Sequence, residues 1–138
     1  MVNDVIFSKC ESIERCIASV AKYYQNNSHA LDDIMVQDAI ILNIERACQL
    51  SIDMGMFLVR ELKLGVPKDS RDVFDKLWEK KIIHTDLAKN LKNMVSFRNI
   101  AVHEYKNIDL KIVESIIETQ LEETFRGFIQ AVLQYTPT

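Results

Sequence analysis

One short stretch carries most of the reactive chemistry in this sequence: FRNIAVHEY, residues 97–105. It places Arg98, His103 and Tyr105 within eight residues. An imidazole can act as a general acid or base near neutral pH, and a guanidinium can hold two phosphate oxygens while staying charged. Such a pair suits RNA cleavage, because RNA supplies its own nucleophile in the 2′-hydroxyl. Arg98 and His103 are therefore a candidate catalytic pair that needs neither a metal nor a cofactor.

The spacing of this pair limits how it can act. In an unbroken helix five residues turn through about 500°, so the two side chains would point about 140° apart. They converge better if the helix ends between Arg98 and His103, or if Arg98 reaches around. One chain also supplies only one histidine from this motif. A two-fold dimer would bring two arginines and two histidines into one cleft, with one imidazole for each proton.

The same residues also have a plain structural interpretation. Arg98 and His103 near the C-terminus of a helix would interact favourably with the helix dipole, and Tyr105 could be a half-buried cover. An arginine followed five residues later by a histidine is a weak motif, although the added tyrosine makes it more specific. The residues alone leave open whether this stretch is a catalytic site or an exposed polar corner.

Polar residues elsewhere could complete such a site. Three of them interrupt an otherwise apolar helical stretch: Asp38, Asn43 and Glu45. They could line the cleft and position Arg98, and Asn99 lies next to Arg98 in the chain. For the residues of the apolar stretch, an ordinary polar edge of a surface helix is the simpler interpretation.

The cysteines and histidines give no sign of a metal centre: Cys10, Cys16, Cys48, His29, His84 and His103. The histidines lie far apart, and no Cys/His spacing of the zinc type occurs. An odd number of cysteines without a C-x-x-C pair indicates reduced, buried thiols in a cytosolic protein. Cys48 lies in an apolar stripe, which disfavours a role as a nucleophile.

Composition sets the class of protein. The 138 residues predict one domain spanning 1–138. Only 3 Gly and 2 Pro occur, and few turn formers favour long helices. The formal net charge of −3 disfavours non-specific binding of DNA or RNA by a monomer, so we expect no DNA partner. The first residues lack the pattern of a signal peptide, and no apolar run reaches the roughly 18 residues of a membrane span. A cytoplasmic location with no membrane partner is expected.

Apolar residues recur at helical spacing along the chain. We expect a first helix over about residues 6–24 and a second over about 31–64, stopped by Gly65 and Pro67. A short helix begins at the N-cap Ser70, and another begins at Thr85 and ends near Arg98. Asp109 caps a last helix whose stripe spans 110–132. The fold class predicted is all-α, an antiparallel bundle of four to five helices.

The motif and its flanks carry a family resemblance. RNIAVHEY resembles the Arg-x4-His-x-Tyr motif of HEPN-domain ribonuclease toxins of the HepT type, the partners of MNT nucleotidyltransferase antitoxins. AIILNIERACQLSIDMG is similar to the long second helix of those chains, and FRNIAVHEYKNIDLKIV to the stretch that leads into their last helix. The resemblance implies a HEPN-like homodimer with a composite cleft for RNA. It also implies Arg98 and His103 as catalytic residues, and Tyr105 as the site where the antitoxin attaches AMP.

These residues and this resemblance are compatible with two functions. The first is a metal-independent endoribonuclease toxin that acts as a dimer. The alternative is a non-catalytic helical module that binds a nucleotide or a nucleotidyltransferase in the same cleft. Both functions use Arg98, but only the first requires His103 to exchange protons.

Overall fold

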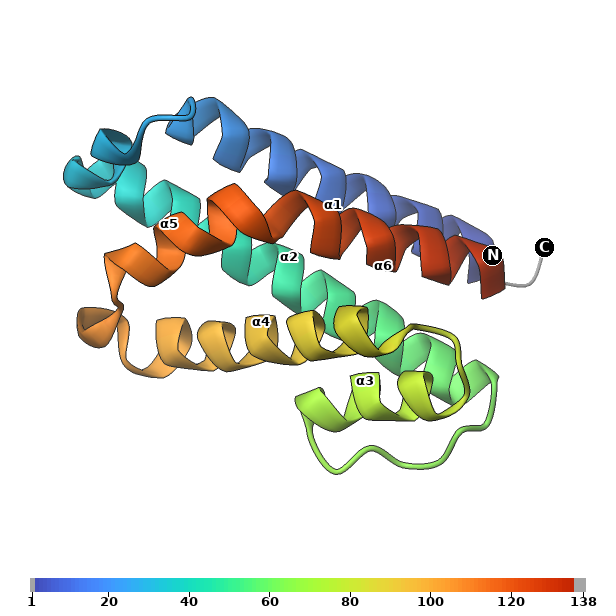
Figure 1. Ribbon diagram of the computed structural model, residues 1–138. Coiled ribbons are helices and arrows are strands. Elements are labelled where there is room, and N and C mark those ends of the chain that lie inside the picture. Colours follow the sequence, from blue (N-terminus) through green and yellow to red (C-terminus); the bar gives the residue numbers. More distant parts are fainter. Residues whose placement is uncertain (1, 136–138) are drawn as a thin grey trace.

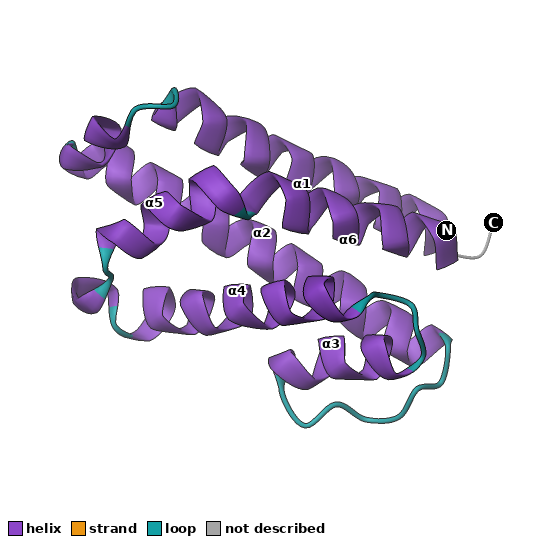
Figure 2. Cartoon of the chain, viewed as in Figure 1, coloured by secondary structure: helices purple, strands orange, loops and turns teal. Residues whose placement is uncertain are grey.

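A computed structural model describes residues 2–135 as a bundle of α-helices (Figure 1). The helices are α1 (Val2–Tyr24), α2 (Ile34–Glu61), α3 (Ser70–Glu79), α4 (Thr85–His103), α5 (Leu110–Thr119) and α6 (Leu121–Tyr135). Two 3-10 turns join them, η1 (Ser28–Asp32) and η2 (Tyr105–Asn107). No strand occurs in the described range (Figure 2), so the all-α prediction is confirmed. Residues 2–135 form six α-helices rather than four to five, because the expected last helix is divided.

The long helices alternate in direction along the chain, so that α2 runs antiparallel to α1 and to α4 (Figure 1). The first two, α1 and α2, form the most extensive pair, and α6 packs against both. On the other side of α2 lies α4, which packs against α2, α3 and α6. The central helix α2 therefore contacts α1, α3, α4 and α6. This arrangement places the C-terminal end of α4, which carries the motif, beside α2.

The apolar stripes predicted from the sequence are mostly buried in the bundle. All six residues of the first stripe are buried: Ile6, Cys10, Ile13, Ile17, Val20 and Tyr24. In the last stripe five residues are buried, namely Val113, Leu121, Phe125, Phe128 and Val132, while Leu110 and Ile117 are partly buried. The buried apolar side chains of α1 to α6 form one core cluster. Within it, Phe74 and Phe128 meet edge to face, with ring centroids 5.5 Å apart.

The second helix is shorter at both ends than predicted. Asp33 is its N-cap, because its side chain accepts hydrogen bonds from the backbone N–H of Met35 at 2.9 Å and of Val36 at 3.4 Å. The helix ends at Glu61, and the chain then turns through positive φ at Lys63 and Gly65. The first left-handed residue after the helix is Lys63, and the Leu64 N–H donates back to the Val59 carbonyl at 2.9 Å, so the helix ends before the predicted stop at Gly65 and Pro67.

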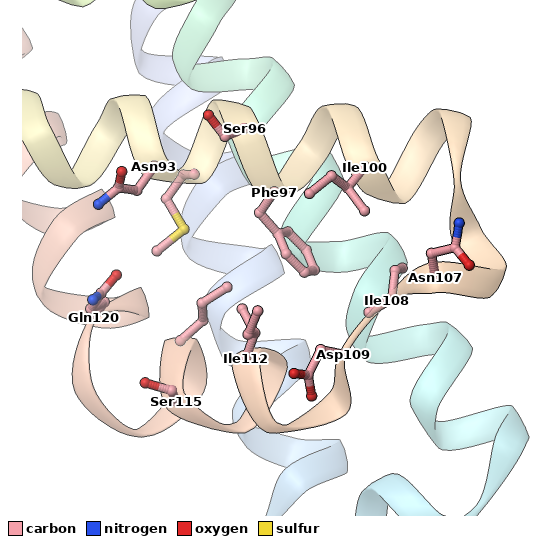
Figure 3. A pocket seen from close by; sticks show the side chains of 12 residues that line it. Asn93, Ser96, Phe97, Ile100, Asn107, Ile108, Asp109, Ile112, Ser115 and Gln120 are labelled. Atoms are coloured by element: carbon pink, nitrogen blue, oxygen red, sulfur yellow. The ribbon is translucent and has the colours of Figure 1, made fainter.

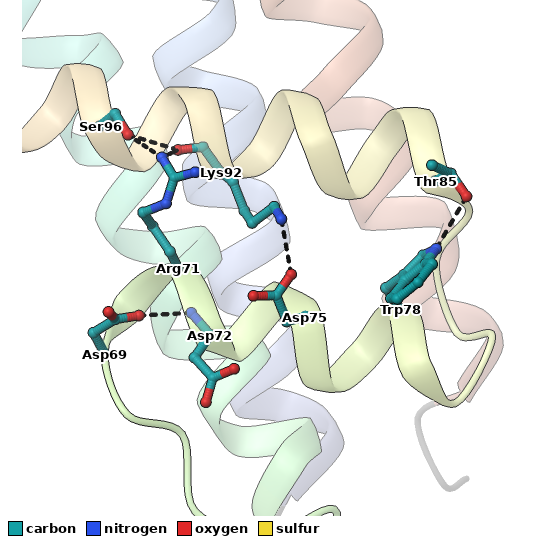
Figure 4. Close-up of polar contacts among 8 residues, drawn as sticks. All are labelled: Asp69, Arg71, Asp72, Asp75, Trp78, Thr85, Lys92 and Ser96. Carbon is teal, nitrogen blue, oxygen red and sulfur yellow. Dashed lines mark hydrogen bonds and ion pairs between the residues drawn. The ribbon is translucent and has the colours of Figure 1, made fainter.

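Two predicted N-caps are wrong by one residue. Asp69 rather than Ser70 caps α3, and its carboxylate accepts from the Asp72 N–H at 2.8 Å (Figure 4). His84 rather than Thr85 caps α4, and its Nδ1 accepts from the Leu87 N–H at 3.2 Å. Ser70 and Thr85 are instead the first residues of the helices themselves. The prediction that Asp109 caps the next helix is confirmed by its bond from the Lys111 N–H at 2.9 Å.

Polar contacts hold α4 against α3 (Figure 4). Arg71 donates to the Lys92 carbonyl oxygen at 3.1 Å and to the Ser96 hydroxyl. Lys92 Nζ lies 2.8 Å from an Asp75 carboxylate oxygen. These contacts fix the middle of α4, and they stabilise the position of the motif at its end.

The three cysteines are free and buried, as the sequence predicts. Within residues 2–135, no helix combines the length and apolar character that a membrane crossing requires.

Candidate active site

The motif occupies the C-terminal end of α4. The prediction that this helix ends near Arg98 is wrong, because α4 continues through His103 and the Glu104 N–H still donates to the Ile100 carbonyl at 2.7 Å. The intervening residues include no glycine or proline, and the buried Ala101 packs in the core, so nothing breaks the helix. Arg98 and His103 therefore point about 140° apart around the helix axis.

Arg98 is partly buried and faces α2. Its Nη2 group donates to Gln49 Oε1 at 2.7 Å, and its Nη1 group donates to Asn99 Oδ1 at 3.0 Å. His103 is the last residue of α4 and is exposed. One side chain of the candidate pair is thus held firmly, whereas the other is open to a ligand or a partner.

Tyr105 begins η2 and packs back towards α2. Its hydroxyl donates to the Asp38 carboxylate. Burial of the ring, this hydrogen bond and the negative charges of Asp38 and Glu45 raise the pKa of Tyr105 to about 12. The hydroxyl is therefore protonated at neutral pH, and the side chain remains 41% exposed.

The face of α2 towards the motif is polar. Asp38, Glu45 and Gln49 are spaced by seven and four residues, which places them on one helical stripe. Asp38 contacts Tyr105, and Glu45 acts on the Tyr105 hydroxyl through its charge. Gln49 contacts Arg98. This stripe of α2 therefore contacts the motif at both ends, at Arg98 and at Tyr105.

Two of the other residues expected near the cleft behave differently. Asn99 contacts Arg98 directly. Asn43 lies five residues from Asp38, about 140° around α2, and its amide donates to the Ala39 carbonyl of its own helix at 2.8 Å. Gln49 was not among the residues predicted from the sequence. Its spacing from Asp38 and Glu45 is the signal that would have found it.

Cys48 is unsuited to nucleophilic chemistry. It is buried, its thiol donates to the Met94 carbonyl oxygen at 3.4 Å, and burial raises its pKa. Among residues 2–135, no group of three or more His, Cys, Asp or Glu side chains is placed to hold a metal ion. The chemistry available at the motif is that of a guanidinium, an imidazole and a phenol.

Exposed apolar side chains also lie beside the motif. Ile100 and Val102, on the turn between Arg98 and His103, are 43% and 48% exposed. A groove of about 370 Å³ opens between α4 and α5, lined among others by Phe97, Ile100, Ile108 and Ile112 (Figure 3). Ile112 is itself 52% exposed. Exposed apolar surface beside a polar motif is typical of a site at which another macromolecule docks.

An all-α bundle with Arg-x4-His-x-Tyr at the end of one long helix is the pattern of a HEPN domain. Residues 13–132 match the family described as Ribonuclease HepT-like. The chain belongs to this HepT-like family.

Relatives and solved structures agree with this assignment. The chain is 39% identical over 131 residues to a protein of Shewanella oneidensis named mRNA nuclease HepT, covering 95% of this chain and 98% of the relative. It is 28% identical over 123 residues to a tRNA nuclease HepT of Aphanizomenon flos-aquae, covering 86% and 82% of the two chains. A tri-AMPylated Shewanella oneidensis HEPN toxin, solved in complex with an MNT antitoxin, superposes with a TM-score of 0.90 at 38% identity, covering 95% and 98%.

Proposed function

We propose that this protein is the toxin of a toxin–antitoxin pair, an endoribonuclease that cuts RNA with Arg98 and His103. The proposal rests on Arg98 and His103 near the C-terminal end of α4, followed by Tyr105 in η2, in a chain of the HepT-like family. Relatives named as mRNA and tRNA nucleases support RNA as the substrate class. A cytoplasmic location accords with an RNA substrate.

The proposed chemistry is internal phosphoryl transfer. The 2′-hydroxyl attacks the adjacent phosphorus, the bond to the 5′-oxygen breaks, and the products carry a 2′,3′-cyclic phosphate and a 5′-hydroxyl. An imidazole removes the 2′-hydroxyl proton, and a protonated imidazole donates a proton to the leaving 5′-oxygen. Arg98 stabilises the negative charge that builds up on the phosphorane. This scheme gives each of three groups one task and needs no metal.

The acting unit that we propose is a two-fold homodimer of single domains spanning 1–138. Because α4 is unbroken, Arg98 and His103 of one chain diverge, and a single chain supplies one imidazole for two proton transfers. The exposed Ile100 and Val102 flank both residues and offer an apolar contact surface for a second copy. A dimer axis near these residues would assemble two Arg98 and two His103 side chains in one cleft.

Control of the enzyme is proposed to pass through Tyr105. A similar toxin is AMPylated and bound to an MNT antitoxin in its solved structure. We propose that an MNT antitoxin is also the partner of this chain and attaches AMP to the Tyr105 hydroxyl. Tyr105 lies two residues from His103, so AMP would add bulk and negative charge where the RNA phosphate approaches.

The experiment that tests this function uses one oligonucleotide in three forms. The all-RNA form should be cut to a 2′,3′-cyclic phosphate and a 5′-hydroxyl, in the presence of EDTA. The forms with 2′-deoxy or 2′-methoxy at the cut site should resist, because they lack the nucleophile. Cleavage of the 2′-methoxy form would refute the proposed chemistry. If no RNA is cut, the non-catalytic binding module takes first place.

A further inference from the structure

A series of side-chain contacts ties Arg98 to the far side of the bundle. Arg98 donates to Gln49 Oε1 at 2.7 Å, and Gln49 Nε2 donates to Asp53 Oδ1 at 2.9 Å. The other carboxylate oxygen of Asp53 lies 3.9 Å from Lys9 Nζ on α1. The series therefore runs from α1 through α2 to the motif on α4.

We propose that Gln49 is a positioning residue for Arg98, an inference that rests on the RNA cleavage proposed above. Gln49 is partly buried and 49 positions away from Arg98 in the chain, so the contact depends on the packing of α2 against α4. It holds the guanidinium in one orientation before the substrate arrives. A charged group that is already oriented stabilises a phosphorane without a further ordering cost.

Asp53 determines which way the Gln49 amide faces. A carboxylate only accepts hydrogen bonds, and a guanidinium only donates them. The NH₂ of Gln49 must therefore face Asp53, and its carbonyl oxygen must face Arg98. The opposite rotamer would set donor against donor at Arg98 and acceptor against acceptor at Asp53. The contact to Asp53 thus fixes the oxygen that receives Arg98.

The two contacts leave the charge of Arg98 available. Both acceptors, Gln49 Oε1 and Asn99 Oδ1, belong to uncharged amides. Among the ion pairs formed by residues 2–135, none includes Arg98. A carboxylate at position 49 would orient the guanidinium equally well, but it would compete with the phosphate for its charge. An amide meets both requirements, which explains a glutamine at this position.

Kinetics of Gln49 variants test this role. Gln49→Ala should lower kcat for RNA cleavage about 10- to 100-fold with little change in KM, because the lost hydrogen bond positions a group that acts in the transition state. Gln49→Glu keeps the size and an acceptor oxygen but adds a negative charge beside Arg98. This variant should lower kcat at least as much as Gln49→Ala and should also raise KM. Gln37→Ala is the matched control, since Gln37 is a partly buried glutamine of the same helix that donates to the Leu31 carbonyl at 3.1 Å.

A double-mutant cycle separates positioning from general support of the fold. In an Arg98→Ala background, Gln49→Ala should cause no further loss of kcat, because the group that it positions is gone. An unchanged kcat in Gln49→Ala, or losses that multiply in the double variant, would overturn the proposal while leaving the nuclease function intact.

A measurement without RNA keeps the two proposals distinguishable. Nitrogen NMR of the Arg98 guanidinium, assigned by its disappearance in Arg98→Lys, reports how freely the group rotates. Separate Nη signals are expected in the wild type, and averaged signals in Gln49→Ala. Averaged signals in the wild type would overturn the positioning role even if no RNA substrate is found. Absence of cleavage with separate signals would count only against the proposed nuclease.

Discussion

The Tyr105 hydroxyl donates a hydrogen bond to the Asp38 carboxylate across 67 positions of the chain. The bond closes η2 onto the start of α2, beside the end of the motif. It also keeps the hydroxyl at a defined place while the side chain stays 41% exposed. A modifying enzyme would therefore find one hydroxyl in one position.

The first prediction concerns that hydroxyl. Tyr105→Phe removes the group that would accept AMP but keeps the ring, so RNA cleavage should persist while modification by the antitoxin is lost. Intact-mass spectrometry after incubation with the antitoxin and ATP measures the gain of AMP. Tyr135→Phe, at the exposed end of α6, is the control and should still be modified. AMP found on the Tyr105→Phe protein would place the modification elsewhere.

The second prediction concerns stability at high pH. The pKa of Tyr24 and that of Tyr105 are both raised to about 12, the first by burial and the charges of Glu118 and Glu114. Each tyrosine is neutral when protonated, so its contribution is complete below the unfolded pKa of about 10 and is lost as pH rises towards 12. The free energy of unfolding, measured in urea, should therefore fall as the pH rises from about 10 to about 12.

Variants assign this loss to particular tyrosines. Tyr105→Phe should make the fall with pH shallower. Asp38→Asn removes a charge that raises the pKa of Tyr105, so tyrosinate absorbance should appear at lower pH in this variant. A free energy of unfolding that stays constant from about pH 10 to 12 would contradict the environment described for both tyrosines.

The third prediction concerns the packing of α3 on α2. A Cβ added at Gly55 would lie 2.5 Å from Val73 Cγ1, and the stiff, buried valine cannot move aside. Gly55→Ala should destabilise the protein by about 1–3 kcal/mol. Gly127→Ala is the control, because its Cβ would meet Leu87 at an ordinary 3.6 Å. This variant should gain about 0.5–1 kcal/mol from helix propensity. Urea unfolding measures the stability of both variants. A Gly55→Ala protein as stable as the wild type would refute the close approach at Gly55.

The sequence predicts the helices well because their signal is local. A stripe such as Ile6, Cys10 and Ile13 defines its own buried face, whatever it packs against. Caps are less certain, since a side chain one residue earlier can satisfy the same N–H groups, as Asp69 and His84 do. The apolar periodicity continues across Gln120, so it does not reveal that the expected last helix is divided there.

The candidate site is only partly predictable from the sequence. The motif stands out because Arg98, His103 and Tyr105 are close in sequence. Gln49 shares a helical stripe with Asp38 and Glu45, but only the packing of α2 against α4 shows that it contacts Arg98. The same holds for the continuation of α4 to His103, since residues that allow a helix do not require one.

The fourth prediction concerns assembly. If Ile100 lies in a dimer interface, Ile100→Glu buries an unpaired charge there and should convert a dimer into a monomer at micromolar concentration. Light scattering measures the mass, and circular dichroism checks that the helices remain. The rate of RNA cleavage should fall as the fraction of dimer falls. Val66→Glu is the control, because Val66 is 89% exposed in the loop before α3. A dimeric Ile100→Glu protein would place the interface elsewhere.

We propose that His103 transfers protons during RNA cleavage, and an assay of histidine variants measures this role. Wild type, His103→Ala and the control His29→Ala, whose histidine is exposed in η1, are compared on one RNA substrate in the presence of EDTA. We expect His29→Ala to match the wild type and His103→Ala to cut roughly 10²–10⁴-fold more slowly. If the His103→Ala protein cuts RNA as fast as the wild type, the cleavage does not arise at this motif and His103 transfers no proton in it.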